Sequence, residues 1–288
     1  MTGMHRIAIK SRGHQAWSCA FALAVAFALV GDAGVALAQS GNPVRAAPER
    51  SPPPRGGKRV EPTEADRYEA CMALTRRDTM AAFEQALNWQ DQGGGAPAKH
   101  CAAAALVAMK QFKEGATRLE ALAQEIKQAE FEQVRIGALA QAGQAWLLAG
   151  DTNRAYAALS AALKLAPQDP EIWIDRGQAL ATAKNYKEAI QDFDQALKID
   201  AERADALMFR ASAWRYMEDL GKARADIDKA LKIAPTDPDA LVERGSIRRL
   251  TEDVAGARED WMTVIRRAPD SSAAAAAQAN LEKLDVKQ

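Results

Sequence analysis

The side chains that most often perform chemistry are sparse in this sequence. Its 288 residues include three histidines and three cysteines, and beyond residue 38 only Cys71, His100 and Cys101 remain. A Ser–His–Asp or Cys–His catalytic set would have to use His100, and a zinc site needs more ligands at characteristic spacings. The glycines at 93–95 lack the Gly-Lys-Ser/Thr that holds phosphate in a nucleotide-binding loop. We therefore expect no enzyme activity, no metal site and no cofactor, with His100 a partly exposed helix residue.

The overall composition narrows the class of fold and of ligand. Hydrophobic residues make up 48% of the chain but aromatics only 6%, and the abundant alanine, a strong helix former, favours closely packed helices over a sheet sandwich. Of 38 basic and 38 acidic residues, residues 1–38 hold three and one, respectively. The remainder is slightly acidic, which argues against nucleic-acid binding, because that function needs a basic surface.

The first 38 residues have the layout of a secretory signal peptide. A basic stretch precedes an uninterrupted apolar run from Ala20 to Val30, and Ala36-Leu37-Ala38 supplies an A-x-A cleavage site before Gln39. The apolar run is too short to span a bilayer comfortably, so an uncleaved anchor is the weaker alternative. We predict cleavage after Ala38, a periplasmic or secreted location, and no integral membrane segment in the mature chain.

Residues 39–63 are rich in proline, glycine and arginine and contain hardly any apolar side chains. Such a segment cannot bury enough surface to offset the entropy lost on ordering. We expect it to be a disordered linker.

From Ile136 onward the sequence repeats every 34 residues. When the repeats are numbered from Ile136, Pro170, Ala204 and Pro238, small residues recur at positions 8, 20 and 27, and three repeats have proline at position 32. Position 24 is large in every repeat: Leu159, Phe193, Ile227 and Trp261. A period of this length indicates structural units that bury their apolar faces by stacking.

This pattern resembles the tetratricopeptide repeat family over residues 136–269, most closely at Asn185–Asp200, and suggests an exported bacterial member. The resemblance implies an all-α fold, a right-handed superhelical solenoid of helix–turn–helix repeats with a C-terminal capping helix. Small residues would let helices A and B of each repeat approach, and the proline at position 32 would end helix B. Asp169-Pro170 and Asp237-Pro238 would start the next helices.

The flanking segments match the pattern less well. Gln111–Gly115 aligns with Asn185–Ala189, which predicts degenerate repeats over 64–128 before four clear repeats over 129–269. Residues 270–288 are expected to form a capping helix and tail. The alanine run in this last segment leaves self-association open.

Charged residues recur together at two repeat positions. Position 7 is arginine and position 23, on the facing helix B, is aspartate in three repeats, whereas the remaining repeat has Ala142 and Ala158. We predict three structural ion pairs, although coincidence stays open in a sample of four repeats. The pairs are Arg176–Asp192, Arg210–Asp226 and Arg244–Asp260.

The resemblance also bears on the two cysteines outside the signal peptide. Cys71 and Cys101 would each lie in the first helix of an N-terminal repeat, and adjacent first helices pack side by side in solenoids of this family. An oxidising compartment would permit a Cys71–Cys101 disulfide. Two small buried thiols are the alternative.

In this family helix A lines the concave face, and positions 2, 5, 6, 9, 12 and 13 commonly meet the ligand. We expect the anchors to be Met208, Phe209, Arg215 and Tyr216, because such side chains are enriched where partners dock. A partly structural role for Phe209 and Tyr216 is the alternative. The other expected groove residues are Glu171, Ile174, Gln178, Asp205, Ser212, Asp239, Val242, Ser246 and Arg249. Acids at positions 2 and 6 and arginines at position 12 would make one groove edge acidic and the other basic.

The function implied by the resemblance is a periplasmic or extracytoplasmic scaffold that binds a peptide or protein in the concave groove. The alternative is a binder of a non-protein envelope ligand, such as peptidoglycan fragments. An envelope enzyme would need a catalytic set that the chain lacks.

Overall fold

The computed structural model describes residues 62–127 and 132–285, and every regular element within them is an α-helix. The signal peptide predicted at 1–38 and nearly all of the predicted linker lie outside the described residues. The helices are α1 (Glu64–Leu74), α2 (Thr79–Asp91), α3 (Gly95–Ala108), α4 (Phe112–Glu125), α5 (Glu132–Leu148), α6 (Thr152–Leu165), α7 (Pro170–Thr182), α8 (Tyr186–Ile199), α9 (Ala204–Tyr216), α10 (Leu220–Ile233), α11 (Pro238–Leu250), α12 (Val254–Arg267) and α13 (Ser272–Asp285).

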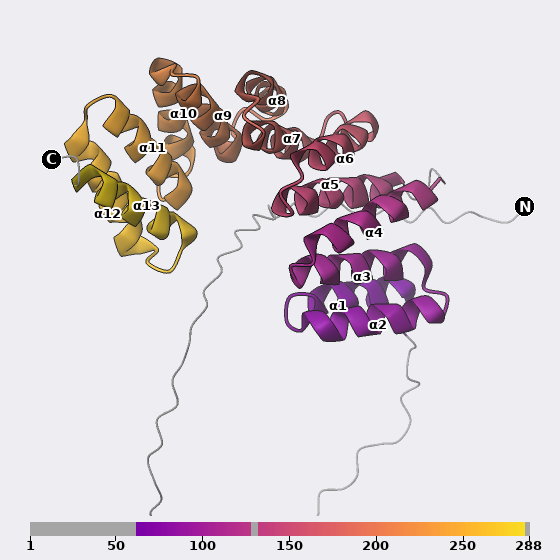
Figure 1. The fold of residues 1–288 in the computed structure, drawn as a ribbon. Coiled ribbons are helices and arrows are strands. Elements are labelled where there is room, and N and C mark those ends of the chain that lie inside the picture. Colours follow the sequence, from indigo (N-terminus) through magenta and orange to yellow (C-terminus); the bar gives the residue numbers. More distant parts are fainter. Residues whose placement is uncertain (1–61, 128–131, 286–288) are drawn as a thin grey trace, which may run out of the picture.

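The helices follow one another around an open arc with α1 and α13 near its two ends (Figure 1). Each helix packs against the next, and α5, α7, α9 and α11 also contact one another from repeat to repeat. Neighbouring B helices, α6 to α12, make at most slight contacts in the described part of the chain. The A helices therefore form the shorter, inner face of the solenoid, and the B helices form the outer face.

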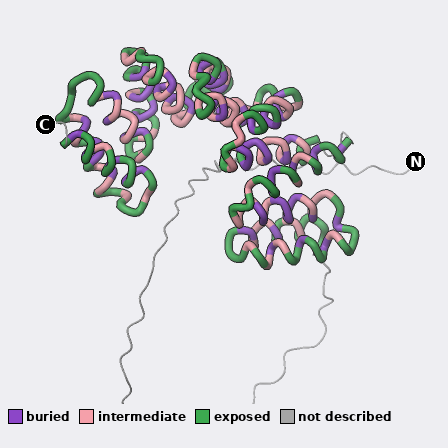
Figure 2. Tube along the Cα trace, in the orientation of Figure 1, coloured by how far each residue is buried: buried purple, intermediate pink, exposed green. Residues whose placement is uncertain are grey.

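Buried residues lie between successive helices and exposed ones at the turns (Figure 2). The core is divided into several apolar clusters, as expected when each unit packs only against its neighbours. Position 8 shows why the repeat needs small residues. A Cβ atom on Gly177 would lie 2.5 Å from the ring of the fully buried Phe193, so the bulky position 24 excludes a side chain there.

Helices A end in a left-handed turn residue at the same place in each repeat. Gly150 has φ of 79°, and its equivalents Lys184, Glu218 and Glu252 have φ of 64–66°. This conformation costs a residue with a side chain about 1 kcal/mol, whereas glycine adopts it without a steric penalty.

We expect Lys184→Gly to raise the free energy of unfolding by about 0.5–1 kcal/mol, because relief of the strain exceeds the added entropy of the unfolded chain. Urea denaturation measures the change. The control is Ala183→Gly, one residue earlier at φ −76°, which should be destabilising by a similar amount. Loss of stability in both variants would contradict the prediction.

Within the described ranges no helix combines the length and apolar character that crossing a bilayer requires.

Candidate functional site

The candidate site is the inner face of α7, α9 and α11, the three helices to which the thirteen expected groove residues belong. Tyr216, on α9, is 56% exposed. Glu171, Asp239 and Arg249 are also exposed, and most of the remaining residues are half-buried. The half-buried set is Gln178, Asp205, Met208, Phe209, Ser212, Arg215, Val242 and Ser246.

Ile174 does not line this face. Its side chain is 2% exposed and belongs to an apolar cluster that also contains Ala206 and Ala213 of α9. Position 5 of α7 therefore points toward the next A helix. The assignment of Ile174 to the groove was wrong because neighbouring A helices pack against one another at this position.

The expected anchors divide into structural and open side chains. Phe209 stacks on the buried Phe193 with 5.9 Å between ring centroids, and Met208 packs against the C-terminal apolar cluster. Tyr216 stacks on Tyr186 at the start of α8, with centroids 4.8 Å apart, yet it keeps more than half of its surface exposed. Of these three, Tyr216 is the side chain most available to a partner.

Arg215 is engaged by the neighbouring repeat. Its Nε donates to Oε1 of Glu243 at 2.6 Å and its Nη2 to Oε2 at 3.1 Å. Both side chains are less than one fifth exposed. This pair ties α9 to α11 across the expected acidic and basic edges, so Arg215 and Glu243 neutralise each other.

A second link between repeats neutralises acids at position 2. The guanidinium of Arg203 contacts Glu171 at 3.0 Å and Asp205 at 2.5 Å. Position 2 of the next repeat is Asp239. The pKa of its carboxyl group is raised, mainly by partial burial and to a smaller extent by the negative charge of the nearby Asp237. In the described chain, neither Asp239 nor Arg249 has an ion-pair partner. The inner face of α11 thus presents an open acid near its start and an open base near its end.

Asp175 of α7 accepts a hydrogen bond from Nε2 of Gln144 on α5 at 2.7 Å. Burial raises the pKa of Asp175 to about 7; the Gln144 hydrogen bond opposes the shift, and Glu171 and Asp169 add to it. The carboxyl group is therefore largely protonated below neutral pH, in contrast to an exposed aspartate.

A raised carboxyl pKa means that the folded protein holds a proton that the unfolded chain releases. The stability from this group is full below the unfolded value of about 4 and is lost as pH rises through about 7. We expect a loss on the order of 1–2 kcal/mol between pH 4 and 7, because water screens a side chain that is not fully buried. Asp175→Asn should flatten this part of the curve in urea titrations. Equal pH slopes in both proteins would contradict the assignment.

The structure brings together all three Arg–Asp combinations. Each arginine binds its aspartate through Nε and Nη2, with the Nη2–Oδ1 distance 2.7 Å for Arg176–Asp192, 2.6 Å for Arg210–Asp226 and 2.6 Å for Arg244–Asp260. The aspartates are buried. These hydrogen bonds raise the pKa of each arginine. The pairs join helix A to helix B within each repeat.

The cysteines and the histidine form one buried cluster in α1–α3. A disulfide joins Cys71 and Cys101, whose Cα atoms are 6.2 Å apart. His100 is 5% exposed rather than partly exposed, and its Nδ1 lies 2.7 Å from the hydroxyl of Tyr68. Burial lowers the pKa of His100, which keeps the ring neutral. The helix pairing that brings the cysteines together also covers the histidine.

Comparison with known proteins agrees with this architecture. Residues 144–214 and 210–273 match two models of the tetratricopeptide repeat. No curated protein sequence matches the chain.

Three solved structures illustrate the likeness. YrrB, described as a tetratricopeptide repeat protein with an unusual peptide-binding site, is 20% identical over 63% of this chain and 92% of its own, with a TM-score of 0.50. Pseudomonas aeruginosa pilF is 16% identical over 75% of this chain and 99% of its own, with a TM-score of 0.57. The matching chain of the APC/C heterotetramer Cut9–Hcn1 is 12% identical over 77% of this chain and 43% of its own, with a TM-score of 0.62. At these identities the likeness concerns the fold.

The fold is of the kind that serves as a protein–protein interaction scaffold, and such scaffolds are generally not enzymes. The 34-residue register, the stacked helix pairs and the two family matches lead to one conclusion: this chain belongs to the tetratricopeptide repeat family.

Proposed function

We propose that the protein is an exported scaffold that binds a peptide or protein segment along the inner face of α7, α9 and α11. The observation that carries the proposal is the set of side chains on this face that stay open to solvent. Tyr216, Asp239 and Arg249 are exposed, and the two charges are unpaired among the described residues. An exposed aromatic on the same face as open charges of both signs is typical of a surface that selects a partner.

The chemistry of the face favours a segment with both charges. Asp239 and Arg249 stand near opposite ends of the 13-residue helix α11, which spans about 20 Å at the usual rise per residue. A partner that places a basic side chain near Asp239 and an acidic one near Arg249 would be bound in a single direction. Gln178, Ser212 and Ser246 add hydrogen-bonding groups along the same face.

Export is supported by the signal-like first 38 residues and by the Cys71–Cys101 disulfide, since disulfides persist mainly in oxidising compartments. We expect the mature protein from the cell envelope to begin at Gln39. N-terminal sequencing after fractionation tests this, and an intact N-terminus in the cytoplasmic fraction would overturn it.

The partner is tested by capture from an envelope extract, with the full chain expressed so that the cell processes it. The variant Tyr216→Ser/Arg249→Glu alters the open side chains and spares Arg215, whose loss would unpair the half-buried Glu243. Lys232→Glu on the outer helix α10 is the control for a general charge change.

A protein retained by the parent and by the control, but lost by the double variant, would support the scaffold. Equal retention by all three would move the binding site off the inner face. Saturable binding of purified peptidoglycan fragments without any protein partner would favour the envelope-ligand alternative instead.

A further inference from the structure

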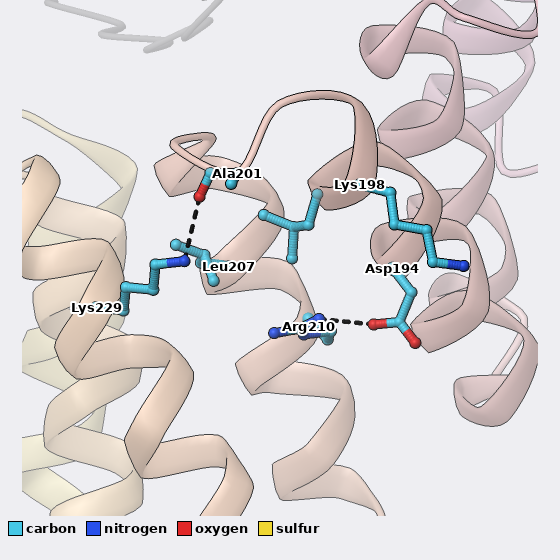
Figure 3. Close-up of a pocket in the computed structure, with 7 residues that line it drawn as sticks. Asp194, Lys198, Ala201, Leu207, Arg210 and Lys229 are labelled. Atoms are coloured by element: carbon cyan, nitrogen blue, oxygen red, sulfur yellow. Dashed lines mark hydrogen bonds and ion pairs between the residues drawn. The ribbon is translucent and has the colours of Figure 1, made fainter.

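A hollow of about 280 Å³ opens between α8, α9 and α10 (Figure 3), and four of its lining residues, Asp194, Leu197, Lys198 and Lys229, come from the outer helices α8 and α10. Leu197 is half-buried at the hollow, Leu207 lies behind it with only 1% of its surface exposed, and Ala201 lies in the turn above them. The charged residues around it are Asp194, Lys198, Arg210 and Lys229. The proposed groove uses none of these seven residues.

The preceding repeat shows what fits in such a place. Position 4 is Trp173 there and Leu207 here, and the residue six places earlier is Pro167 there and Ala201 here. The indole Nε1 of Trp173 donates to the carbonyl oxygen of Pro167 at 2.9 Å. The hollow therefore lies where, one repeat earlier, the protein places its own indole ring.

Arg210, beside the hollow, is held by an aspartate in the same way as Arg176 in the preceding repeat. Arg176 lies over the ring of Trp173, with 4.8 Å from its Cζ to the ring centroid, while Asp192 fixes its guanidinium. Arg210 is fixed in the same way by Asp226 and also donates to Asp194 at 2.6 Å. An aromatic ring in the hollow would meet a guanidinium that is already positioned for a cation–π contact.

The rim of the hollow is basic. Lys198 and Lys229 flank it on opposite sides (Figure 3), and both are exposed. Lys229 makes a 3.3 Å contact with the carbonyl oxygen of Ala201, and neither lysine has a carboxylate partner among the described residues. The one lining carboxylate, Asp194, is engaged by Arg210. Acidic groups beside an inserted ring would therefore be attracted from both sides.

We propose that this hollow is a second partner-binding site, which receives an aromatic side chain, tryptophan above all, from a protein segment with acidic residues on either side. The ring takes the place that Trp173 fills in the preceding repeat, its N–H reaches the carbonyl of Ala201, and the flanking acids face Lys198 and Lys229. The site would let the outer face engage a partner independently of the inner face.

The test is an NMR titration of the ¹⁵N-labelled protein with the peptide acetyl-Glu-Trp-Glu-amide. We expect saturable shifts at the amides of Ala201, Leu207 and Lys229 with a Kd on the order of 1 mM. Acetyl-Glu-Ala-Glu-amide should give no saturable shifts, and acetyl-Lys-Trp-Lys-amide should bind at least about tenfold more weakly.

Leu207→Trp would fill the hollow from within and should weaken the peptide about tenfold or more while the circular dichroism spectrum stays helical. If that variant does not fold, Lys198→Glu/Lys229→Glu replaces it, and the preference should then reverse toward the lysine peptide. The inner-face variant Tyr216→Ser/Arg249→Glu should bind the peptide like the parent, which separates this site from the proposed groove. The proposal would be overturned if Leu207→Trp bound the peptide as tightly as the parent, or if Lys198→Glu/Lys229→Glu kept the parent's preference for the glutamate peptide. It would also be overturned if the peptide shifted only amides of the inner face, or if the shifts did not saturate.

Discussion

Replacing Cys71 and Cys101 by alanine should lower the free energy that holds α1–α3 together by about 3–4 kcal/mol, the value expected for a loop of this length. The disulfide closes a separation of 30 residues, and both cysteines are fully buried. It fastens α1, which within the described part of the chain packs mainly against α2 and α3. Hydrogen exchange should show faster exchange in α1 and α2, with α9–α12 as an internal reference.

Each single replacement should cost about as much as the double one, because either breaks the same bond. Reduction of the parent protein should produce the same exchange pattern, although slowly, since the sulfur atoms are reached only when the helices open. Unchanged protection of α1 after double replacement would show that packing against α2 and α3 suffices.

Asp192→Ala should be the more informative of the large destabilising changes, with an expected loss of about 2–3 kcal/mol. It leaves the Arg176 guanidinium, 17% exposed, without the carboxylate that binds it through two hydrogen bonds. Removal of one member of a buried pair is usually costlier than 3 kcal/mol, but the partial exposure of this arginine moderates the effect. Urea denaturation measures the loss.

The double variant Arg176→Ala/Asp192→Ala should regain a large part of that loss. The protein supplies the precedent, since the first clear repeat has Ala142 and Ala158 at the two positions, and both are buried. A double-mutant cycle would then give a coupling energy above about 1 kcal/mol. Arg176 also lies over the rings of Trp173 and Tyr156, with its Cζ 4.8 Å and 5.4 Å from their centroids. Additive losses would show that the arginine contributes through these rings rather than through the ion pair.

Among the ion pairs, the sequence predicted those that recur in several repeats and missed one that joins a single pair of repeats. The Arg–Asp pairs were visible because positions 7 and 23 change together in several repeats. The Arg215–Glu243 pair joins position 12 of one repeat to position 6 of the next, and the preceding junction has Ala181 and Phe209 at these places. A contact with a single instance leaves no pattern, so Arg215 was expected to be an open anchor.

Burial on the inner face was also hard to foresee. Position 5 is Ile174, Met208 and Val242 in successive repeats, and only the first is fully buried. Which of three similar apolar residues is covered depends on the side chains of the next A helix, here around Ala206. Likewise, the exchange of Trp173 for Leu207 is plain in the sequence, but its consequence, an open hollow, appears only once α8, α9 and α10 are packed.

The spacing of Arg210 and its acids bears on how such a chain can grow. This arginine contacts Asp194 sixteen residues before it and Asp226 sixteen residues after it. A tandem duplication of residues 204–237 would give the new arginine Asp228 at the first distance and a copy of Asp226 at the second. A duplication of 34 codons therefore keeps the arginine at position 7 between two acids, whereas an insertion of another size between Arg210 and Asp226 would change the spacing of that pair.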